Sequence, residues 1–240
     1  MLVATSGLFY RGFRDGVFSG LPFSLVLVPF GMLFGVVATE AGLNIFEVMA
    51  FSVLVIAGAA QLSAVSLMSE NAPVLIVLAI SLAVNLRMGL YSAALVPTFG
   101  KLPLWKRSLA CYWLFDQPFA LTSVDLKKNP NRSVDERLGF FFGVGIPLSI
   151  FWYSATFIGA YLGEFFPTNI GLDYAIAATF LSLIAPLLRS PAHLAAAFVS
   201  VLGTLLLQSL PFNTGLLIAA LAAMLVGAEI ERRLPKKGGV

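Results

Sequence analysis

Four polar side chains lie near the middle of stretches that are otherwise almost wholly apolar: Gln61, Asn85, Arg87 and Asp116. A charge at the centre of a bilayer costs about 2.5–3.5 kcal/mol on insertion scales. Such a residue is kept where it has a partner, a water-filled cavity or a function. Arg87 cannot lose its charge and needs an anion, which could be a substrate carboxylate or Asp116. A purely structural pair of these two residues is the alternative.

The other polar residues suit the recognition of a zwitterion. The amide of Gln61 can both donate and accept a hydrogen bond, although it could equally serve an interhelical hydrogen bond. Asn85 and Arg87 are two positions apart, so they point to different sides of a helix. Asp116 could carry a proton, because burial favours the neutral carboxyl group while a neighbouring guanidinium favours the charged one. We therefore expect these residues to surround one cavity near mid-membrane, with Asp116 coupling transport to protons.

The elements that must position these residues are membrane helices. The chain is 59% apolar and 11% charged, whereas soluble domains are about 25% charged. Apolar runs of about 20 residues recur along the whole length, as in helical membrane proteins. The expected fold is all-α and polytopic, with one transporter domain over residues 1–240. The apolar segments are 16–38, 46–68, 73–96, 108–126, 138–163, 171–188, 192–210 and 213–229.

The composition excludes several classes of function. No hydrophilic stretch is long enough for a soluble catalytic or nucleic-acid-binding domain, and no protease or P-loop motif is present, so we expect neither an enzyme nor a cofactor. A channel would need a continuous polar face on several spans, and these spans carry isolated polar residues instead. One cysteine, Cys111, excludes a disulfide framework.

Orientation follows from the lysine and arginine residues in the loops. With eight spans and a cytoplasmic N-terminus, eleven basic residues lie inside, and Lys101, Lys106 and Arg107 lie outside. The basic loop at 100–107 is the exception to the rule. A re-entrant third or fourth segment would leave seven crossings and move the C-terminus outside, which is the alternative.

The two halves of the chain, about 14–126 and 138–229, resemble each other weakly. Gly20-Leu-Pro22-Phe-Ser24 opens the first, and Gly145-Ile-Pro147-Leu-Ser149 opens the second. Matching glycine and proline positions in transporter repeats point to the binding site. This pattern predicts an internal repeat, with breaks in the first helix near Pro22–Gly31 and in the fifth near Gly145–Pro147.

The order of several motifs resembles the AzlC-type branched-chain amino acid permeases. The motifs cover about residues 13–185 and read FRDGVFSGLPFSLVLVPFGMLFG, GAAQ, NLRMGLYSA, FDQPFAL, WYSATFIGAYLG and GLDYAIAATFLSL. One departure is Gln117-Pro118 after Asp116, where the family often has a glutamate, so a second carboxylate in a proton relay is in doubt.

The resemblance implies a transporter that exports valine, leucine or isoleucine across the bacterial inner membrane with a small AzlD-type membrane partner. Carried over from the family pattern, the substrate-binding residues would be Pro22, Gly31, Gly58, Gln61, Asn85 and Arg87, with Asp116 in proton coupling. The rival interpretation is a non-transporting membrane subunit that assembles another complex. Small-xxx-small pairs such as Gly12/Gly16/Gly20, Gly139/Gly143 and Gly159/Gly163 would serve assembly equally well.

Overall fold

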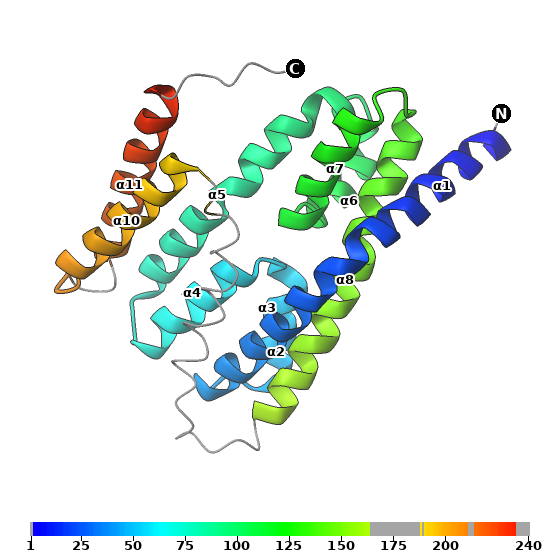
Figure 1. The fold of residues 1–240 in the computed structure, drawn as a ribbon. Helices are drawn as coiled ribbons and strands as arrows, with labels where there is room; N and C mark the ends of the chain where they lie inside the picture. Colours follow the sequence, from blue (N-terminus) through cyan, green and yellow to red (C-terminus); the bar gives the residue numbers. More distant parts are fainter. Residues whose placement is uncertain (1, 164–187, 189, 211–213, 234–240) are drawn as a thin grey trace. The chain divides into compact units, whose positions relative to one another are not determined.

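The computed structural model describes residues 2–163, 188, 190–210 and 214–233, which form helices and no strands. The predicted sixth span falls almost entirely outside these residues. The helices are α1 (Leu2–Gly20), the 3₁₀ helix η1 (Leu21–Phe23), α2 (Ser24–Glu40), α3 (Ile45–Val55), α4 (Gly58–Ser69), α5 (Val74–Phe99), α6 (Leu104–Tyr112), α7 (Asp116–Lys128), α8 (Val134–Gly163), α10 (Pro191–Leu206) and α11 (Thr214–Arg233) (Figure 1).

Four of the described helical segments are long and apolar enough to cross a membrane: Gly7–Glu40, Val74–Phe99, Val134–Gly163 and Thr214–Arg233. The all-α, polytopic membrane fold is thereby confirmed, while the total number of spans stays a prediction. The chain divides into two compact units, of residues 1–66 with 81–170 and of residues 67–80 with 171–240. This division does not follow the predicted halves, because α8 belongs to the first unit; the repeat and the single domain stay predictions.

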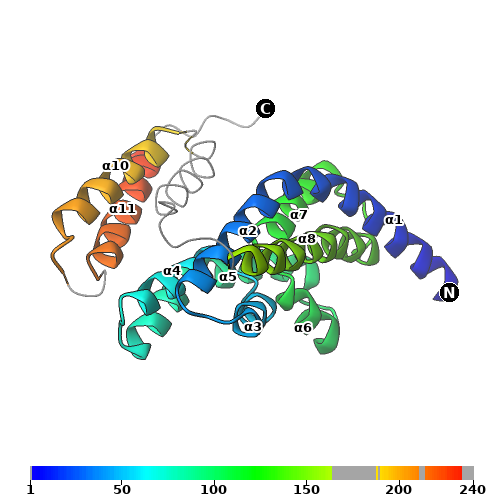
Figure 2. The same cartoon turned by 90° about the horizontal axis from the view of Figure 1, so that it is seen from below.

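The first unit is built on α1 and α2, which lie along α8 in both views (Figures 1 and 2). Glycines let the backbones touch: a Cβ at Gly16 would collide with the carbonyl of Phe140, and one at Gly35 would collide with that of Thr156. Since positions 16 and 35 meet positions 140 and 156 in the same order, α1 and α2 both run parallel to α8. The small-residue pairs that could have bound a partner are therefore used within the chain.

The predicted break in the first span is present at Pro22, but it is small. One 3₁₀ turn separates α1 from α2, and the hydroxyl of Ser24 donates to the carbonyl of Leu21. From there α2 is helical through Pro29 and Gly31. The helix tightens to a 3₁₀ turn at Pro22 and continues without a non-helical segment.

The predicted break in the fifth span is wrong. Helix α8 runs without interruption through Gly145 and Pro147. A proline removes one backbone donor, but hydroxyl side chains and close neighbouring helices can compensate in membrane helices. The carbonyl left without its donor is that of Gly143, and the backbone of α1 lies directly against this residue.

The interrupted helices are instead the second and fourth predicted segments. The second is divided into α3 and α4 at Ile56, whose φ of 39° is left-handed and ends α3. The fourth is divided into α6 and α7 by Trp113, Leu114 and Phe115. Ile56 and Phe115 are both buried in one cluster with Leu148 of α8, so the two interruptions meet inside the first unit.

Helix α6 enters the first unit at the end where α8 begins. Lys106 Nζ lies 3.8 Å from Asp135 Oδ1 in the first turn of α8. Trp113, just after α6, lies farther along α8, because a Cβ at Gly145 would be 3.1 Å from the Cβ of Trp113. The segment from Lys106 to Trp113 thus extends along α8 from its first turn to about Gly145.

Helix α7 returns to the end from which α6 came. Near its C-terminus, Asp125 Oδ2 lies 3.4 Å from Nη1 of Arg132, in the loop that leads into α8. The segment predicted as a fourth crossing, 108–126, is therefore a helical hairpin that enters and leaves on one side. This course agrees with the re-entrant alternative for the fourth segment, because it puts Lys106 at the same end of the first unit as Arg132. Which side of the membrane this end faces stays a prediction.

This end of the first unit is called the basic end. It carries the lysines and arginines of the loops around α6, α7 and α8 together with those of α1, namely Arg11, Arg14, Lys101, Lys106, Arg107, Lys127, Lys128, Arg132 and Arg137. Helix α5 ends here too, since the rings of Phe99 and Phe141 lie 5.8 Å apart. Further back along α5, Met88 packs against the buried cluster that extends along α8 to Leu148, and the ribbon shows α5 running opposite to α8 (Figure 1).

In the second unit, α10 and α11 form an antiparallel pair. Gly203 faces Ala219, and Gly227 faces Ala196, so the positions meet in reverse order. The Ser190 side chain accepts the backbone N–H of His193 and caps α10. None of the predicted site residues lies in this unit.

Candidate functional site

The central feature of the first unit is an ion pair between α5 and α7. Arg87 Nη1 lies 3.0 Å from Asp116 Oδ2. The other carboxylate oxygen accepts the hydroxyl of Tyr91 over 2.9 Å. Tyr91 is one helical turn from Arg87 and stacks on Phe119, with ring centroids 4.1 Å apart. Asp116 is therefore held from two points on α5.

The local sequence explains why Asp116 is where it is. It is the first residue of α7, after Phe115 in an extended conformation. An acidic first residue is favoured at a helix start, because the free N–H groups and the helix dipole are positive there. Pro118 is tolerated in the first turn, because the N–H that it lacks would have no acceptor within the helix. Asp116 thus brings a carboxylate to the buried end of a hairpin, beside the N–H groups that begin α7.

The ion pair leaves some polar groups without a partner in the described part of the chain. The side chains of Arg87 and Asp116 are 34% and 43% exposed, so the described residues do not enclose the pair. Arg87 Nε and Asn85 Oδ1 are buried without a hydrogen-bond partner. A buried polar atom of this kind costs about 1–3 kcal/mol and calls for a ligand or an ordered water.

Gln61 lies in a different hydrogen-bond network. Its side chain is fully buried, and Oε1 accepts the backbone N–H of Ala57 over 3.1 Å. Its Nε2 lies 3.2 Å from the hydroxyl of Ser52, which in turn lies 3.2 Å from the hydroxyl of Thr156 on α8. These bonds fasten the break between α3 and α4 to α8. No described hydrogen bond links Gln61 to the ion pair, and its binding role stays a prediction.

Of the three small predicted site residues, Gly31 and Gly58 are packing positions in the first unit, whereas Pro22 is exposed. Pro22 lies in the 3₁₀ turn. Gly31 and Gly58 both face Trp152 of α8, where an added Cβ would come within 3.2 Å and 2.9 Å of the indole ring. They shape the protein around the break between α3 and α4, and a role in substrate binding remains untested.

A second ionic cluster was not predicted. Arg132 is only 15% exposed and lies among three carboxylates, with Nη2 hydrogen-bonded to Asp15, Nη1 3.4 Å from Asp125 and Nε 3.7 Å from Glu136. It joins α1, α7 and α8 at the basic end. Asn129 also donates to Asp125 over 2.7 Å. In the sequence these residues are charges at the ends of apolar segments, which is the usual place for solvated loop residues. The parallel packing of α1 and α8 brings Asp15 close to Arg132 and Glu136.

Comparisons with known proteins place the chain among membrane proteins. It is 28% identical over 219 residues to an uncharacterized membrane protein of Archaeoglobus fulgidus, covering 89% of this chain and 93% of the relative. It is 26% identical over 225 residues to the inner membrane protein YgaZ of Escherichia coli, covering 90% and 87%. An uncharacterized membrane protein of Helicobacter pylori is 26% identical over 176 residues, covering 73% and 75%.

No solved structure matches the chain. Residues 22–166 match the family profile described as AzlC protein, and this range contains α2 to α8 with both interrupted segments and the ion pair. The relatives extend the similarity to most of the chain. The resemblance found in the motifs is confirmed: the protein belongs to the AzlC family.

Proposed function

We propose that this chain exports branched-chain amino acids across the bacterial inner membrane, coupled to protons through Asp116 and with a small AzlD-type subunit. The observation that carries the proposal is the accessible pair of Arg87 and Asp116 at the start of a half-helix. Broken helices whose termini lie inside the membrane are the usual binding elements of secondary transporters. The family supplies the class of substrate.

The charges suit a zwitterionic amino acid. A substrate carboxylate can replace Asp116 at the guanidinium of Arg87, and the N–H groups that begin α7 favour the same negative charge. The substrate ammonium group would then face Asp116. Arg87 and Asp116 would then each exchange one charged partner for another, so neither charge is left unpaired when the substrate binds. Protonation of Asp116 would weaken its hold on both Arg87 and the ammonium group, which offers a route for coupling.

The direction of insertion follows from the basic end. With α6 and α7 as a hairpin, every lysine and arginine of the loops in the first unit lies on one side, and such loops face the cytoplasm. This orientation puts the N-terminus of α1 in the cytoplasm. It also places the mouth of the α6–α7 hairpin on the side from which an exporter takes its substrate.

The rival function is a membrane subunit that only assembles another complex. Two observations favour transport. The glycines that could have bound a partner already pack α1 and α2 onto α8. The described residues also leave the charged pair more than one-third exposed on average, which suits a site that is open to a ligand.

Counterflow in proteoliposomes tests the proposed function. Vesicles that contain the purified chain and unlabelled leucine should accumulate labelled leucine, isoleucine or valine, and labelled lysine should not enter. Preparations with and without a co-expressed small subunit would show whether the partner is required. Absence of counterflow in both preparations, with monodisperse protein, would contradict the proposal.

A further inference from the structure

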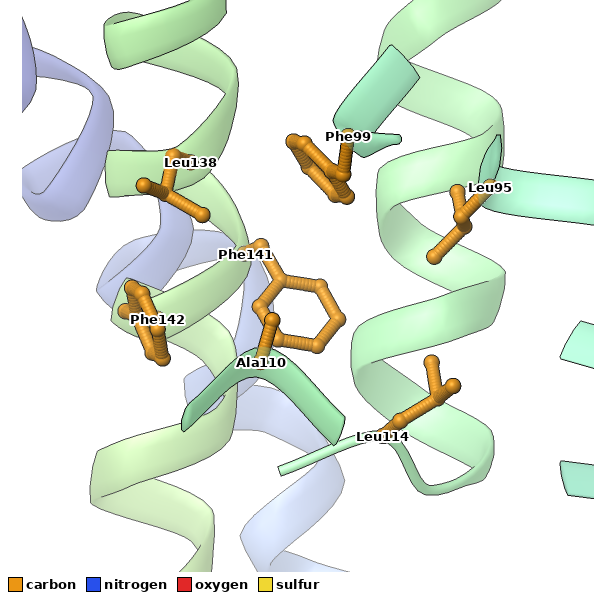
Figure 3. Packing of buried hydrophobic residues seen from close by; sticks show 7 residues of the cluster. All are labelled: Leu95, Phe99, Ala110, Leu114, Leu138, Phe141 and Phe142. Carbon is orange, nitrogen blue, oxygen red and sulfur yellow. The ribbon is translucent and has the colours of Figure 1, made fainter. Parts of the chain in front are cut away.

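A second feature of the first unit is a cavity between α5, α6 and α8 at the basic end. Its volume is about 260 Å³, and Phe141 of α8 forms its floor. Figure 3 shows Phe141 pointing from α8 toward α5, with Leu95 and Phe99 of α5 facing it and Leu114 nearby. These residues make most of the cavity surface apolar.

The few polar groups of the cavity carry positive charge and no negative charge. Arg107 lines it and donates to the Gly100 carbonyl over 3.2 Å, which orients the guanidinium at the rim. The hydroxyls of Ser92 and Ser108 also line it. An apolar wall with one cation favours a ligand that has an aliphatic body and one carboxylate. It disfavours a second positive charge.

The size of the cavity fits a small ligand. Pockets for drug-sized ligands start at about 300 Å³. The cavity therefore has room for a small ligand such as a free aliphatic amino acid.

The cavity also adjoins the ion pair through the chain. Ser92 of its lining follows Tyr91, whose hydroxyl binds Asp116. Leu114 of its lining belongs to the turn that leads into Asp116. The lining residues of α5 and of the turn before α7 are thus close in sequence to the residues of the charged pair.

We propose that this cavity is the reception pocket of the exporter, in which the aliphatic side chain lies against Phe141 and Leu95 and the carboxylate meets Arg107. This inference rests on the proposed function, because that function supplies the amino acid. Leu114, which lines the pocket, is two residues before Asp116 in the chain. The pocket selects for aliphatic side chains, and the ion pair then recognises the charged ends.

The chain carries a natural reporter of occupancy. Cys111 is exposed, lines the cavity and is the one cysteine in the sequence. Alkylation of the full-length protein by a maleimide should slow by about tenfold at leucine concentrations ten times the dissociation constant. Lysine at the same concentration should leave the rate unchanged.

A pair of variants tests the position of the pocket. Ser92→Phe fills the cavity from α5, and Ala93→Phe places the same ring on the neighbouring exposed position outside the lining. Ser92→Phe should raise the leucine concentration for half-maximal protection of Cys111 at least about tenfold, since one methylene in an apolar pocket already changes selectivity about 10–200-fold. Ala93→Phe should not.

The outcomes separate the pocket from transport. Counterflow with no protection of Cys111 by leucine overturns the pocket and leaves transport standing. Protection without counterflow supports the pocket and contradicts transport. Protection by a long-chain fatty acid but by no amino acid shows a lipid groove and overturns the pocket. Equal effects of Ser92→Phe and Ala93→Phe also overturn it.

Discussion

Replacing Asp116 by asparagine should separate proton coupling from substrate exchange. Asparagine keeps an oxygen that can accept the hydroxyl of Tyr91, so the position of α7 against α5 is retained. It removes the one group of the ion pair that can carry a proton. Gradient-driven accumulation of leucine should be lost, while exchange of leucine for leucine should continue at a reduced rate.

The structure also sets the expected loss of stability. Removing one partner of a fully buried pair costs about 3–5 kcal/mol, and exposed pairs are worth about 0.2–1 kcal/mol. The side chains of Arg87 and Asp116 are 34% and 43% exposed, which places the pair between these limits. We expect a cost of about 1–2 kcal/mol. At about 2–4 °C per kcal/mol for a chain of this size, the melting temperature should fall by about 2–8 °C.

The assay needs a matched control and three measurements. Asp135→Asn removes a carboxylate of similar exposure, 36%, which faces Lys106 at the basic end. Melting temperature in detergent, leucine exchange and pH-gradient-driven uptake should be measured for both variants. Asp135→Asn should change none of them greatly. A well-folded Asp116→Asn protein with normal gradient-driven transport would refute the role of Asp116, and one that does not fold would show that the pair is structural.

Three further outcomes are expected. Gly143→Val should destabilise the protein by about 3 kcal/mol or more, because the new side chain meets the backbone of α1; Gly89→Val, which meets nothing within 4 Å, should be near neutral in the same thermal-shift assay. Gln61→Ala should cost about 1–3 kcal/mol through unsatisfied hydrogen bonds, and unchanged leucine affinity would assign Gln61 to the fold alone. Cysteines at Lys101 and Asn131, in a cysteine-free background, should react with an impermeant maleimide from the same side of the membrane; reaction from opposite sides is incompatible with the hairpin.

The composition sufficed to predict the fold class, because long apolar helices leave a clear signal at every position. The cost of an unpaired charge in an apolar span also predicted an anion beside Arg87, with Asp116 as one of two candidates. The structure confirms that the two meet. What this argument could not supply is the path of the backbone that brings α7 back toward the basic end.

The breaks were misplaced because proline and glycine act locally, whereas these breaks are held by distant contacts. Pro147 stays within α8, where the backbone of α1 packs directly against Gly143, one turn before the proline. The break at Ile56 has no proline, and it persists because Ile56 is buried and Gln61 accepts the N–H of Ala57. The one break that the sequence indicates locally is the start of α7, because Asp116 and Pro118 are residue types that favour the first turn of a helix.

The two kinds of helix in the first unit suggest how a transporter of this shape could move. Helices α1, α2 and α8 are joined by backbone contacts at glycines, which leave no room for sliding. The charged pair instead joins α5 to α7, through side chains that are one-third exposed or more. A substrate that takes the place of this pair removes the main polar contact between α5 and the hairpin, and leaves the glycine-packed frame unchanged. We therefore expect leucine binding to raise hydrogen exchange in α5 and α7 and not in α8, because only the former elements exchange a protein partner for the ligand.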